Sequence, residues 1–213
     1  MKGDLALPDV SGLILAGGAS TRMGRDKGLL ELAGRPVVLW VLERLEAVAG
    51  EIAIATSPSN DADYRRIAPE GVRCVPDDVA GQGPLGGWLS GLPALHGSYV
   101  AVVPCDTPLY APALGRLLVG RAWGHDGAVP RIGKYFEPLH GVYRREALLE
   151  ATRRTIAAGL SRPVHTYAHL DIVEVREPEL READPELRSF RNANTPEDFA
   201  LLRTLVATPD ARP

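Results

Sequence analysis

Cysteine is scarce in this sequence: only Cys74 and Cys105 occur among 213 residues. The two are too far apart for a zinc motif and do not suggest a disulfide framework, so we expect a reducing compartment. No apolar run approaches the roughly 18 residues that a membrane helix needs. The N-terminal residues also lack the basic and apolar regions of a signal peptide. We therefore expect a soluble, cytoplasmic protein.

An excess of basic residues is also absent. The formal net charge is -3 and the isoelectric point is about 6.0, which argues against a dedicated nucleic-acid binder. The length fits one α/β domain, and the hydrophobic content of 45% is that of a globular protein. We expect a single domain over residues 11–207, with an N-terminal lead at 1–10 and a tail at 208–213.

Several catalytic signatures are missing as well. No Gly-Lys-Ser or Gly-Lys-Thr occurs, which argues against a P-loop NTPase, and none of the five histidines lies in an H-E-x-x-H motif. A G-x-G-x-x-G match at Gly81, Gly83 and Gly86 does not follow the first strand, and Pro84 lies inside it. We interpret this match as accidental rather than as a dinucleotide-binding loop.

What is present is an alternation of short apolar runs and helical patterns. Strands are expected at 12–16, 52–55, 72–75, 99–103, 127–131, 139–143 and 172–175. Helices are expected at 36–48, 61–67, 86–95, 111–119, 145–158 and after Thr195, where T-P-E-D is a capping motif. The remainder of 159–187 has no clear pattern. The alternation predicts an α/β fold: a Rossmann-like three-layer sandwich around a mostly parallel, mixed sheet.

The loop after the first strand is rich in glycine and positive charge. It reads GGASTRMGRDKG over residues 17–28. Gly17 and Gly18 let backbone N–H groups approach a phosphate closely. Arg22 and Lys27 add positive charge, and an arginine can bind a phosphate through two parallel hydrogen bonds. This combination favours a triphosphate-binding loop over a plain solvated turn.

Carboxylates follow two later strands. Asp77 comes after the third strand and is placed to bind a ribose or base, although a surface turn explains it equally well. Asp106 follows strand 99–103 directly, between Pro104 and Pro108. Mg²⁺ usually takes one or two carboxylates together with phosphate oxygens and water. We therefore expect Asp106 to bind Mg²⁺ rather than to cap the next helix, which begins several residues later.

Two further side chains are ambiguous. Trp88 lies beside the second glycine-rich loop and could stack on a base, but core packing is the favoured interpretation. His140 lies on an apparent apolar strand. We expect a core or rim histidine with satisfied hydrogen bonds rather than a ligand-binding one.

Four motifs together point to a family. They read LAGGASTRMGRDKG at 15–28, GPLGG at 83–87, PCDTP at 104–108 and NANTPED at 192–198. With them the sequence resembles molybdenum cofactor guanylyltransferase over almost the whole chain, from about residue 11 to 206. The first motif is shared by many nucleotidyltransferases, whereas the combination is more specific. The resemblance implies a nucleotidyltransferase that uses Mg²⁺ to transfer GMP from GTP to the terminal phosphate of molybdopterin, releasing pyrophosphate.

The resemblance also implies roles for individual residues. Nucleotide binding is assigned to Leu15, Ala16, Gly17, Gly18, Lys27, Asp77 and Asp106. Asn192 and Asn194 match positions around the pterin substrate, and their spacing would place both amides on one face of a strand. Capping of the last helix is the alternative for these asparagines. Where the family often has asparagine after the second strand, this chain has Ser57, so nucleotide contact there stays an open question.

The expected mechanism needs no strong general base, because a phosphate monoester oxygen is already ionised near neutral pH. Catalysis would come from positioning and from charge neutralisation by Lys27, Arg22 and Asp106. Two alternatives stay open. One is an enzyme of the same superfamily with another base or acceptor, such as a cytidylyl- or sugar-phosphate nucleotidyltransferase. The other is a non-catalytic nucleotide-binding protein.

The expected ligands are thus GTP and molybdopterin, with neither nucleic acid nor membrane as a partner. Cofactor-delivery proteins or molybdoenzymes are the protein partners that such an activity would imply. The sequence itself does not indicate an oligomeric state.

Overall fold

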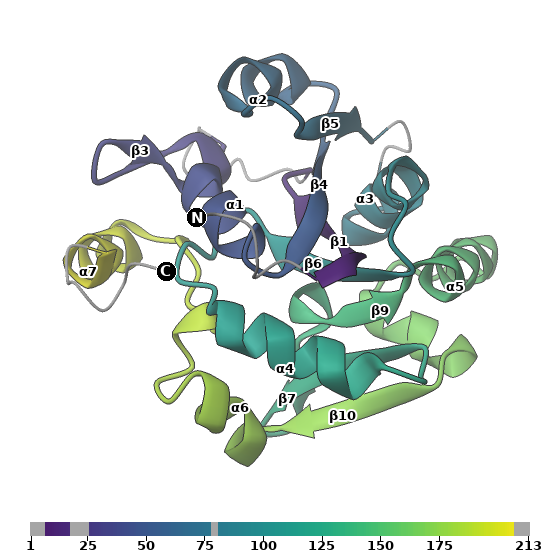
Figure 1. Ribbon diagram of the computed structural model, residues 1–213. Coiled ribbons are helices and arrows are strands. Elements are labelled where there is room, and N and C mark those ends of the chain that lie inside the picture. Colours follow the sequence, from purple (N-terminus) through teal and green to yellow (C-terminus); the bar gives the residue numbers. More distant parts are fainter. Residues whose placement is uncertain (1–6, 18–25, 78–80, 207–213) are drawn as a thin grey trace.

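The computed structural model describes residues 7–17, 26–77 and 81–206. Its centre is an eight-stranded sheet with the order β10-β7-β9-β6-β1-β4-β5 and with β8 beside β7 (Figure 1). The strands are β1 (Leu7–Leu15), β4 (Ala49–Thr56), β5 (Arg73–Pro76), β6 (Tyr99–Pro104), β7 (Gly127–Ile132), β8 (Tyr135–Phe136), β9 (Val142–Arg144) and β10 (Ile172–Arg176). β2 (Glu31–Leu32) and β3 (Arg35–Pro36) pair as a separate hairpin.

The sheet is parallel around β1 and antiparallel around β9. β1 pairs in parallel with β4 and β6, β4 with β5, and β7 with β10. β9 runs antiparallel to both β6 and β7, and β8 runs antiparallel to β7. The prediction of a mostly parallel, mixed sheet is therefore confirmed.

Helices cover both faces of this sheet. They are α1 (Val37–Leu45), α2 (Asp61–Ile67), α3 (Pro84–Gly91), α4 (Pro112–Ala122), α5 (Arg145–Ala157), α6 (Glu177–Ala183) and α7 (Pro196–Val206). Short 3-10 segments lie at η2 (Lys27–Leu29), η3 (Leu92–Ala94), η4 (Pro138–His140), η5 (Pro163–His169) and η6 (Arg188–Phe190). None of the described helices has the length and apolar character that crossing a bilayer requires.

The side chains of β1 point alternately to the two faces of the sheet, and this explains the three layers. Ile14 packs into the core formed with α1, α4 and α6, whereas Leu13 and Leu15 pack into the core formed with α3 and α5. Successive side chains of a strand point to opposite faces, so one apolar run supplies both cores. Trp88 is fully buried in the second core, tilted against Tyr143 with 5.7 Å between ring centroids. Its interpretation as a core residue is confirmed.

Two predicted strands differ from those in the structure. β1 begins at Leu7, so residues 7–10, which we expected to precede the domain, belong to its central strand. The strand expected at 139–143 is divided: η4 occupies Pro138–His140, and only Val142–Arg144 is extended. Proline cannot donate to a strand ladder but suits the start of a helical turn, and this turn is closed by the His140 N–H on the Glu137 carbonyl at 3.0 Å.

The capping motif before α7 is confirmed. Thr195 Oγ1 accepts from the Asp198 N–H at 3.1 Å, and the Asp198 carboxylate accepts from the Thr195 N–H at 2.9 Å. The helix packs through Phe199 and Leu202 against the β2–β3 hairpin and the start of α1. With α7 packed in this way, the segment that precedes it lies beside the end of β6. There the Ala193 N–H donates to the Asp106 carbonyl at 2.8 Å.

Candidate active site

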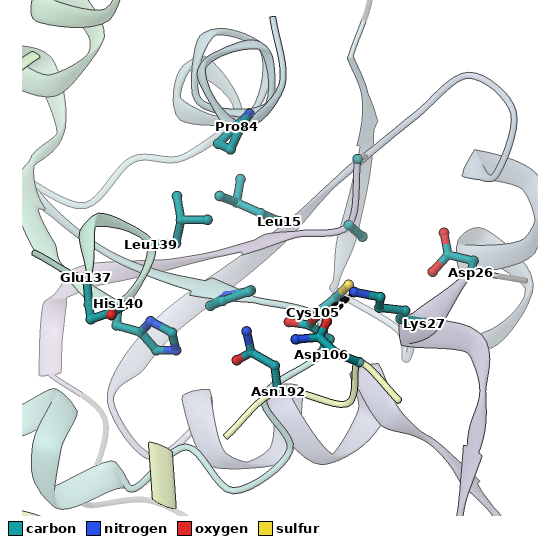
Figure 2. A pocket seen from close by; sticks show the side chains of 14 residues that line it. Leu15, Asp26, Lys27, Pro84, Cys105, Asp106, Glu137, Leu139, His140 and Asn192 are labelled. Carbon is teal, nitrogen blue, oxygen red and sulfur yellow. Dashed lines mark hydrogen bonds and ion pairs between the residues drawn. The ribbon is translucent and has the colours of Figure 1, made fainter. Parts of the chain in front are cut away.

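A cavity of about 340 Å³ lies at the carboxyl ends of β1 and β6 (Figure 2). This is the edge at which open α/β sheets bind their ligands. The predicted site residues that line it are Leu15, Ala16, Gly17, Lys27, Asp106, Asn192 and Asn194. The structure thus brings together residues from the first loop, from the end of β6 and from the segment before α7.

Lys27 and Asp106 face one another within this cavity. The Lys27 Nζ lies 3.6 Å from the Asp106 Oδ2, and the side chains are 19% and 15% exposed. Burial raises the pKa of Asp106, and the charge of Lys27 opposes that shift. The Cys105 N–H donates to the Leu15 carbonyl at 3.0 Å, which fixes the two strand ends relative to each other.

Asn194 is the second partner of Lys27, because the lysine ammonium donates to its side-chain oxygen. The expectation that Asn192 and Asn194 lie on a strand is wrong: the residues between η6 and α7 have no strand pairing. Both asparagines nevertheless line the cavity. The helix cap is Thr195, so neither asparagine side chain supplies that bond.

Asp26 holds the start of η2 in place. Its Oδ1 accepts from the Gly28 N–H at 3.0 Å and from the Tyr64 hydroxyl at 2.6 Å. The Asn60 amide donates both to the other Asp26 oxygen and to the Ala16 carbonyl, the latter at 3.0 Å. We call Asp26, Asn60 and Tyr64 the Asp26 clamp. It ties the residue before Lys27 to α2 and to the end of β1.

The first loop is packed closely against this clamp. A Cβ added to Gly28 would lie 2.2 Å from the Tyr64 hydroxyl and 3.1 Å from the Cys105 side chain. Any larger residue at position 28 would therefore displace the clamp or the end of β6. The glycine allows Lys27 to approach Asp106.

Sequence reasoning missed the Asp26 clamp, although Asp26 is the only acid in the loop 17–28. A single acid among several cations was the feature of the sequence that could have indicated this role. Its partners Asn60 and Tyr64, 34 and 38 residues later, show no such feature in the sequence. Ser57 does not line the cavity described here; its N–H donates to the Asn60 side-chain oxygen at 2.7 Å. A side-chain amide therefore does follow β4 in this chain, but it belongs to Asn60, three positions after Ser57.

Three predicted site residues lie elsewhere. Gly18 and Arg22 fall outside the residues that the structure describes. Asp77 is described but is not among the residues lining the cavity. It lies at the end of the edge strand β5, where Ser90 Oγ donates to its Oδ1 at 3.3 Å. Ligand contact by Asp77 would thus occur on the β5 side of the cavity.

The other side of the cavity carries polar groups that lack partners. His140 is only 4% exposed, and neither ring nitrogen makes a hydrogen bond within the described part of the chain. The Asn192 Oδ1 is likewise buried and unbonded there. Burial lowers the pKa of His140 to about 4 despite the nearby Ser189 backbone, and burial raises the pKa of Glu137. His140 is thus the core histidine that we expected, packed against Phe190 and beside the Ser189 backbone.

The cavity thus has two distinct ends. The paired end consists of Asp26, Lys27, Asp106 and Asn194, which are linked to each other or to neighbouring backbone. The unpaired end consists of Glu137, His140 and Asn192 (Figure 2).

The paired end fits a metal that arrives with a nucleotide. Among the described residues there is no group of three or more histidine, cysteine or acidic side chains that could enclose an ion. The Asp26 carboxylate is occupied by three donors, which leaves Asp106 as the carboxylate of the paired end that is available to a metal. Mg²⁺ commonly needs only one or two protein carboxylates when phosphate oxygens complete its shell.

Comparison with known proteins places this geometry in a family. Residues 12–171 match the MobA-like NTP transferase domain. The chain is 37% identical over 196 residues to the probable molybdenum cofactor guanylyltransferase of Natronomonas pharaonis, covering 91% of this chain and 96% of the relative. It is 34% identical over 204 residues to the molybdenum cofactor guanylyltransferase of Burkholderia vietnamiensis, covering 92% and 96%.

Solved structures agree. The crystal structure of molybdopterin-guanine dinucleotide biosynthesis protein A from Archaeoglobus fulgidus superposes with a TM-score of 0.78 at 25% identity, covering 92% of this chain and 98% of that one. The 2-C-methyl-D-erythritol 4-phosphate cytidylyltransferase of Thermus thermophilus has a TM-score of 0.69 at 19% identity, over 94% of this chain and 100% of that one, and shares the fold. The chain therefore belongs to the molybdenum cofactor guanylyltransferase family of MobA-like NTP transferases.

Proposed function

We propose that this enzyme transfers GMP from GTP to the terminal phosphate of molybdopterin, releasing pyrophosphate and forming the guanine dinucleotide form of the cofactor. Relatives that carry the guanylyltransferase name match over nine-tenths of the chain, which supports this choice of donor and acceptor. The free thiols of Cys74 and Cys105 support the further proposal that it works in the reducing cytoplasm.

One observation carries the proposal: a lysine and a carboxylate face each other, 3.6 Å apart, in a cavity at the strand ends. Phosphoryl transfer asks a protein mainly to position the groups and to neutralise charge. The cation suits the phosphates of the donor. The carboxylate suits the metal that accompanies them, and both are already held in place before substrate arrives.

In the proposed reaction, a phosphate oxygen of the acceptor attacks the α-phosphorus of GTP. The bond between the α-phosphorus and its bridging oxygen breaks, and pyrophosphate leaves in line with the attack. Lys27 donates to the phosphate oxygens and balances the charge that develops on the leaving pyrophosphate. The attacking oxygen is already ionised near neutral pH, so the chain need not supply a strong base.

Asp106 would hold Mg²⁺, which when bound neutralises phosphate charge. The Asp26 clamp and Asn194 keep Lys27 oriented, so little reorganisation is needed at the moment of transfer. Gly17, at the end of β1, lies at the cavity wall, and a Cβ added there would lie 3.3 Å from the Thr56 carbonyl oxygen at the end of β4.

The proposal is tested by incubating the purified protein with Mg²⁺, GTP and molybdopterin and detecting the products by mass spectrometry. We expect a guanine dinucleotide cofactor and one pyrophosphate per turnover. Parallel reactions with CTP and ATP test the base, and a reaction without acceptor tests for simple hydrolysis. Efficient transfer from CTP alone would assign the enzyme to another activity, and no transfer from any nucleotide would refute the proposal.

A further inference from the structure

Helix α2 lies beside the site without lining the cavity. The structure describes the whole helix and the preceding Asn60, and none of these residues is among those that line the cavity. Figure 1 shows α2 next to β5, at the end of the sheet opposite to β10. Side chains of the helix and of Asn60 nevertheless bond to three segments that lead to the site: the residue before Lys27, the end of β4 and the strand β5.

Two pairs of side chains, each four residues apart, make these bonds. Asn60 and Tyr64 both donate to Asp26 and form the Asp26 clamp. The next two positions, Asp61 and Arg65, form an ion pair in which the Arg65 Nε donates to the Asp61 Oδ2 at 2.5 Å. Residues four apart lie on the same face of a helix, so each pair can serve one neighbouring segment. The second pair lies one position further round the helix than the clamp.

This second pair joins the ends of β4 and β5. The Thr56 Oγ1 at the end of β4 donates to the Asp61 Oδ1 at 2.7 Å, and the Arg65 Nη2 donates to the Cys74 carbonyl of β5 at 2.8 Å. β5 has four residues and is the last strand of the described sheet, so a neighbouring strand holds it on one side only. Arg65 therefore supplies a side-chain bond to a short edge strand that few other contacts fix.

Asp77 is held by the same two strand ends. Its N–H donates to the Thr56 carbonyl at 2.7 Å, and it follows Cys74 by three residues. The contacts thus form a closed ring that runs from Arg65 through Asp61 and Thr56 to Asp77, and back along β5 to Cys74. A change at Arg65 alters both of the backbone anchors of Asp77.

The ion pair contributes little to the stability of the fold. The Arg65 side chain is 54% exposed, and exposed ion pairs are weak because water and salt screen them. Burial acts to raise the pKa of Asp61, but the hydrogen bonds from Arg65 and Thr56 lower it overall, so the carboxylate is charged at neutral pH. A substitution of Arg65 is therefore expected to leave a folded protein in which the position of Asp77 can be tested.

From these contacts we infer that Arg65 is a positioning residue for the nucleoside part of GTP, and that it acts on Asp77 through Asp61 and the Cys74 carbonyl. This inference rests on the proposed function and on the predicted nucleotide contact of Asp77. Arg65 itself does not touch the substrate. Together with the Asp26 clamp, it makes α2 the common support of the phosphate-binding lysine and of the nucleoside contact.

The test measures the Kd for Mg²⁺-GTP by calorimetry and the kinetic constants for dinucleotide formation. For Arg65→Ala we expect the Kd and KM for GTP to rise about fivefold, with kcat and the KM for molybdopterin unchanged. Arg65→Lys should lie between the two proteins, because a lysine cannot hold Asp61 and the Cys74 carbonyl in one planar fork.

Arg66→Ala is the matched control. Arg66 is the next residue of the same helix, its side chain is 75% exposed, and it donates to Asp63 of α2 at 2.9 Å. We expect its affinity for GTP to equal that of the wild type.

A double variant tests the route through Asp77. Asp77→Ala alone should weaken GTP binding. If Arg65 acts through Asp77, adding Arg65→Ala to Asp77→Ala causes no further loss of affinity. A residue that only supports the fold would instead lower the affinity by the same factor whether or not Asp77 is present.

The outcomes separate this inference from the function on which it rests. A wild type that binds GTP but forms no dinucleotide refutes the proposed function, and the Kd values still test Arg65. An unchanged Kd in Arg65→Ala or in Asp77→Ala, or equal effects of Arg65→Ala with and without Asp77, refutes only the inference. A fall in kcat at unchanged Kd would place the effect of Arg65 on Lys27 and overturn it. So would an Arg65→Ala variant that unfolds while Arg65→Lys binds GTP like the wild type.

Discussion

The two ends of the cavity differ in how their polar groups are satisfied. At the paired end, Lys27 contacts Asp106 and Asn194, and Asp26 accepts three hydrogen bonds. At the unpaired end, His140 and the Asn192 oxygen have no hydrogen-bond partner in the described structure. The polar groups of the paired end thus bond to one another, whereas those of the unpaired end are buried without such mutual bonds.

The mutual bonds of the paired end suit the transfer proposed above. Stabilising charge during phosphoryl transfer requires groups that do not reorganise, so their mutual bonds are part of the catalytic design. Substitutions at single residues test the difference between the two ends.

The largest effect is expected for Asp106→Asn. The amide keeps the size of the side chain but removes the charge that would hold Mg²⁺, so turnover should fall about 10²–10³-fold. Thermal unfolding should show that the fold survives. Near wild-type rates at saturating Mg²⁺ would remove Asp106 from the metal site.

For Lys27→Ala we expect GTP binding to weaken about 10- to 100-fold, because a charged hydrogen bond to phosphate is lost. Isothermal calorimetry with GTP measures this directly. The acceptor KM should change little, since Lys27 belongs to the paired end. Unchanged affinity for GTP would contradict the assignment of this end to the phosphates.

A third prediction concerns pH and the unpaired end. The folded protein holds His140 uncharged with a pKa of about 4, whereas the unfolded chain binds a proton near the ordinary value of 6.5. Stability should therefore be complete above about pH 6.5 and fall as the pH drops toward 4. At pH 5 the loss from this residue is about 2 kcal/mol.

Urea unfolding at pH 7 and pH 5 checks this prediction, with His140→Leu as the comparison. The raised pKa values of Glu137 and Asp106 act in the opposite direction, but both proteins contain these residues. The difference between the proteins should thus isolate His140. Equal losses of stability in the two proteins would show that His140 is not held uncharged by burial.

The smallest effect is expected for Asp26→Asn in the Asp26 clamp. The new amide can still accept from Gly28 and Tyr64, but its nitrogen would face the Asn60 amide nitrogen, donor against donor. We expect a loss of about 1–2 kcal/mol in unfolding free energy and a decrease in kcat of about tenfold, because Lys27 is misplaced. An Asp26→Asn enzyme with normal kcat would show that the clamp does not position Lys27.

Tyr64→Phe is the milder variant of the same clamp. It removes one hydrogen-bond donor only and should lower the free energy of unfolding by about 1 kcal/mol.

Much of the fold followed from local patterns. The run GLILA predicted a buried strand because alternating residues supply two cores, and Leu13 and Ile14 lie in different ones. The motif T-P-E-D predicted the cap of α7 because the Thr195 and Asp198 side chains accept from backbone N–H groups within the motif and from that of the adjacent Asn194. Such features depend on neighbours in sequence and can be read there.

The features that the sequence analysis predicted wrongly or missed depend on contacts between distant residues or on the effect of a proline. The apolar letters around His140 suggested a strand, but Pro138 directs the chain into η4. The Asp26 clamp joins residues 34 and 38 positions apart, and no local pattern predicts that pairing. The burial of His140 depends on packing against Phe190 of η6, with 4.9 Å between ring centroids. Neither the site's support nor its unpaired end was therefore visible in the sequence.

The role of the paired end in transfer is tested most directly by one kinetic comparison. Wild type, Lys27→Ala and Asp106→Asn are assayed together for pyrophosphate release from GTP in the presence of Mg²⁺ and molybdopterin. The account predicts that both variants lose most of this activity while thermal unfolding shows both to be folded. Wild-type rates in both folded variants would contradict it.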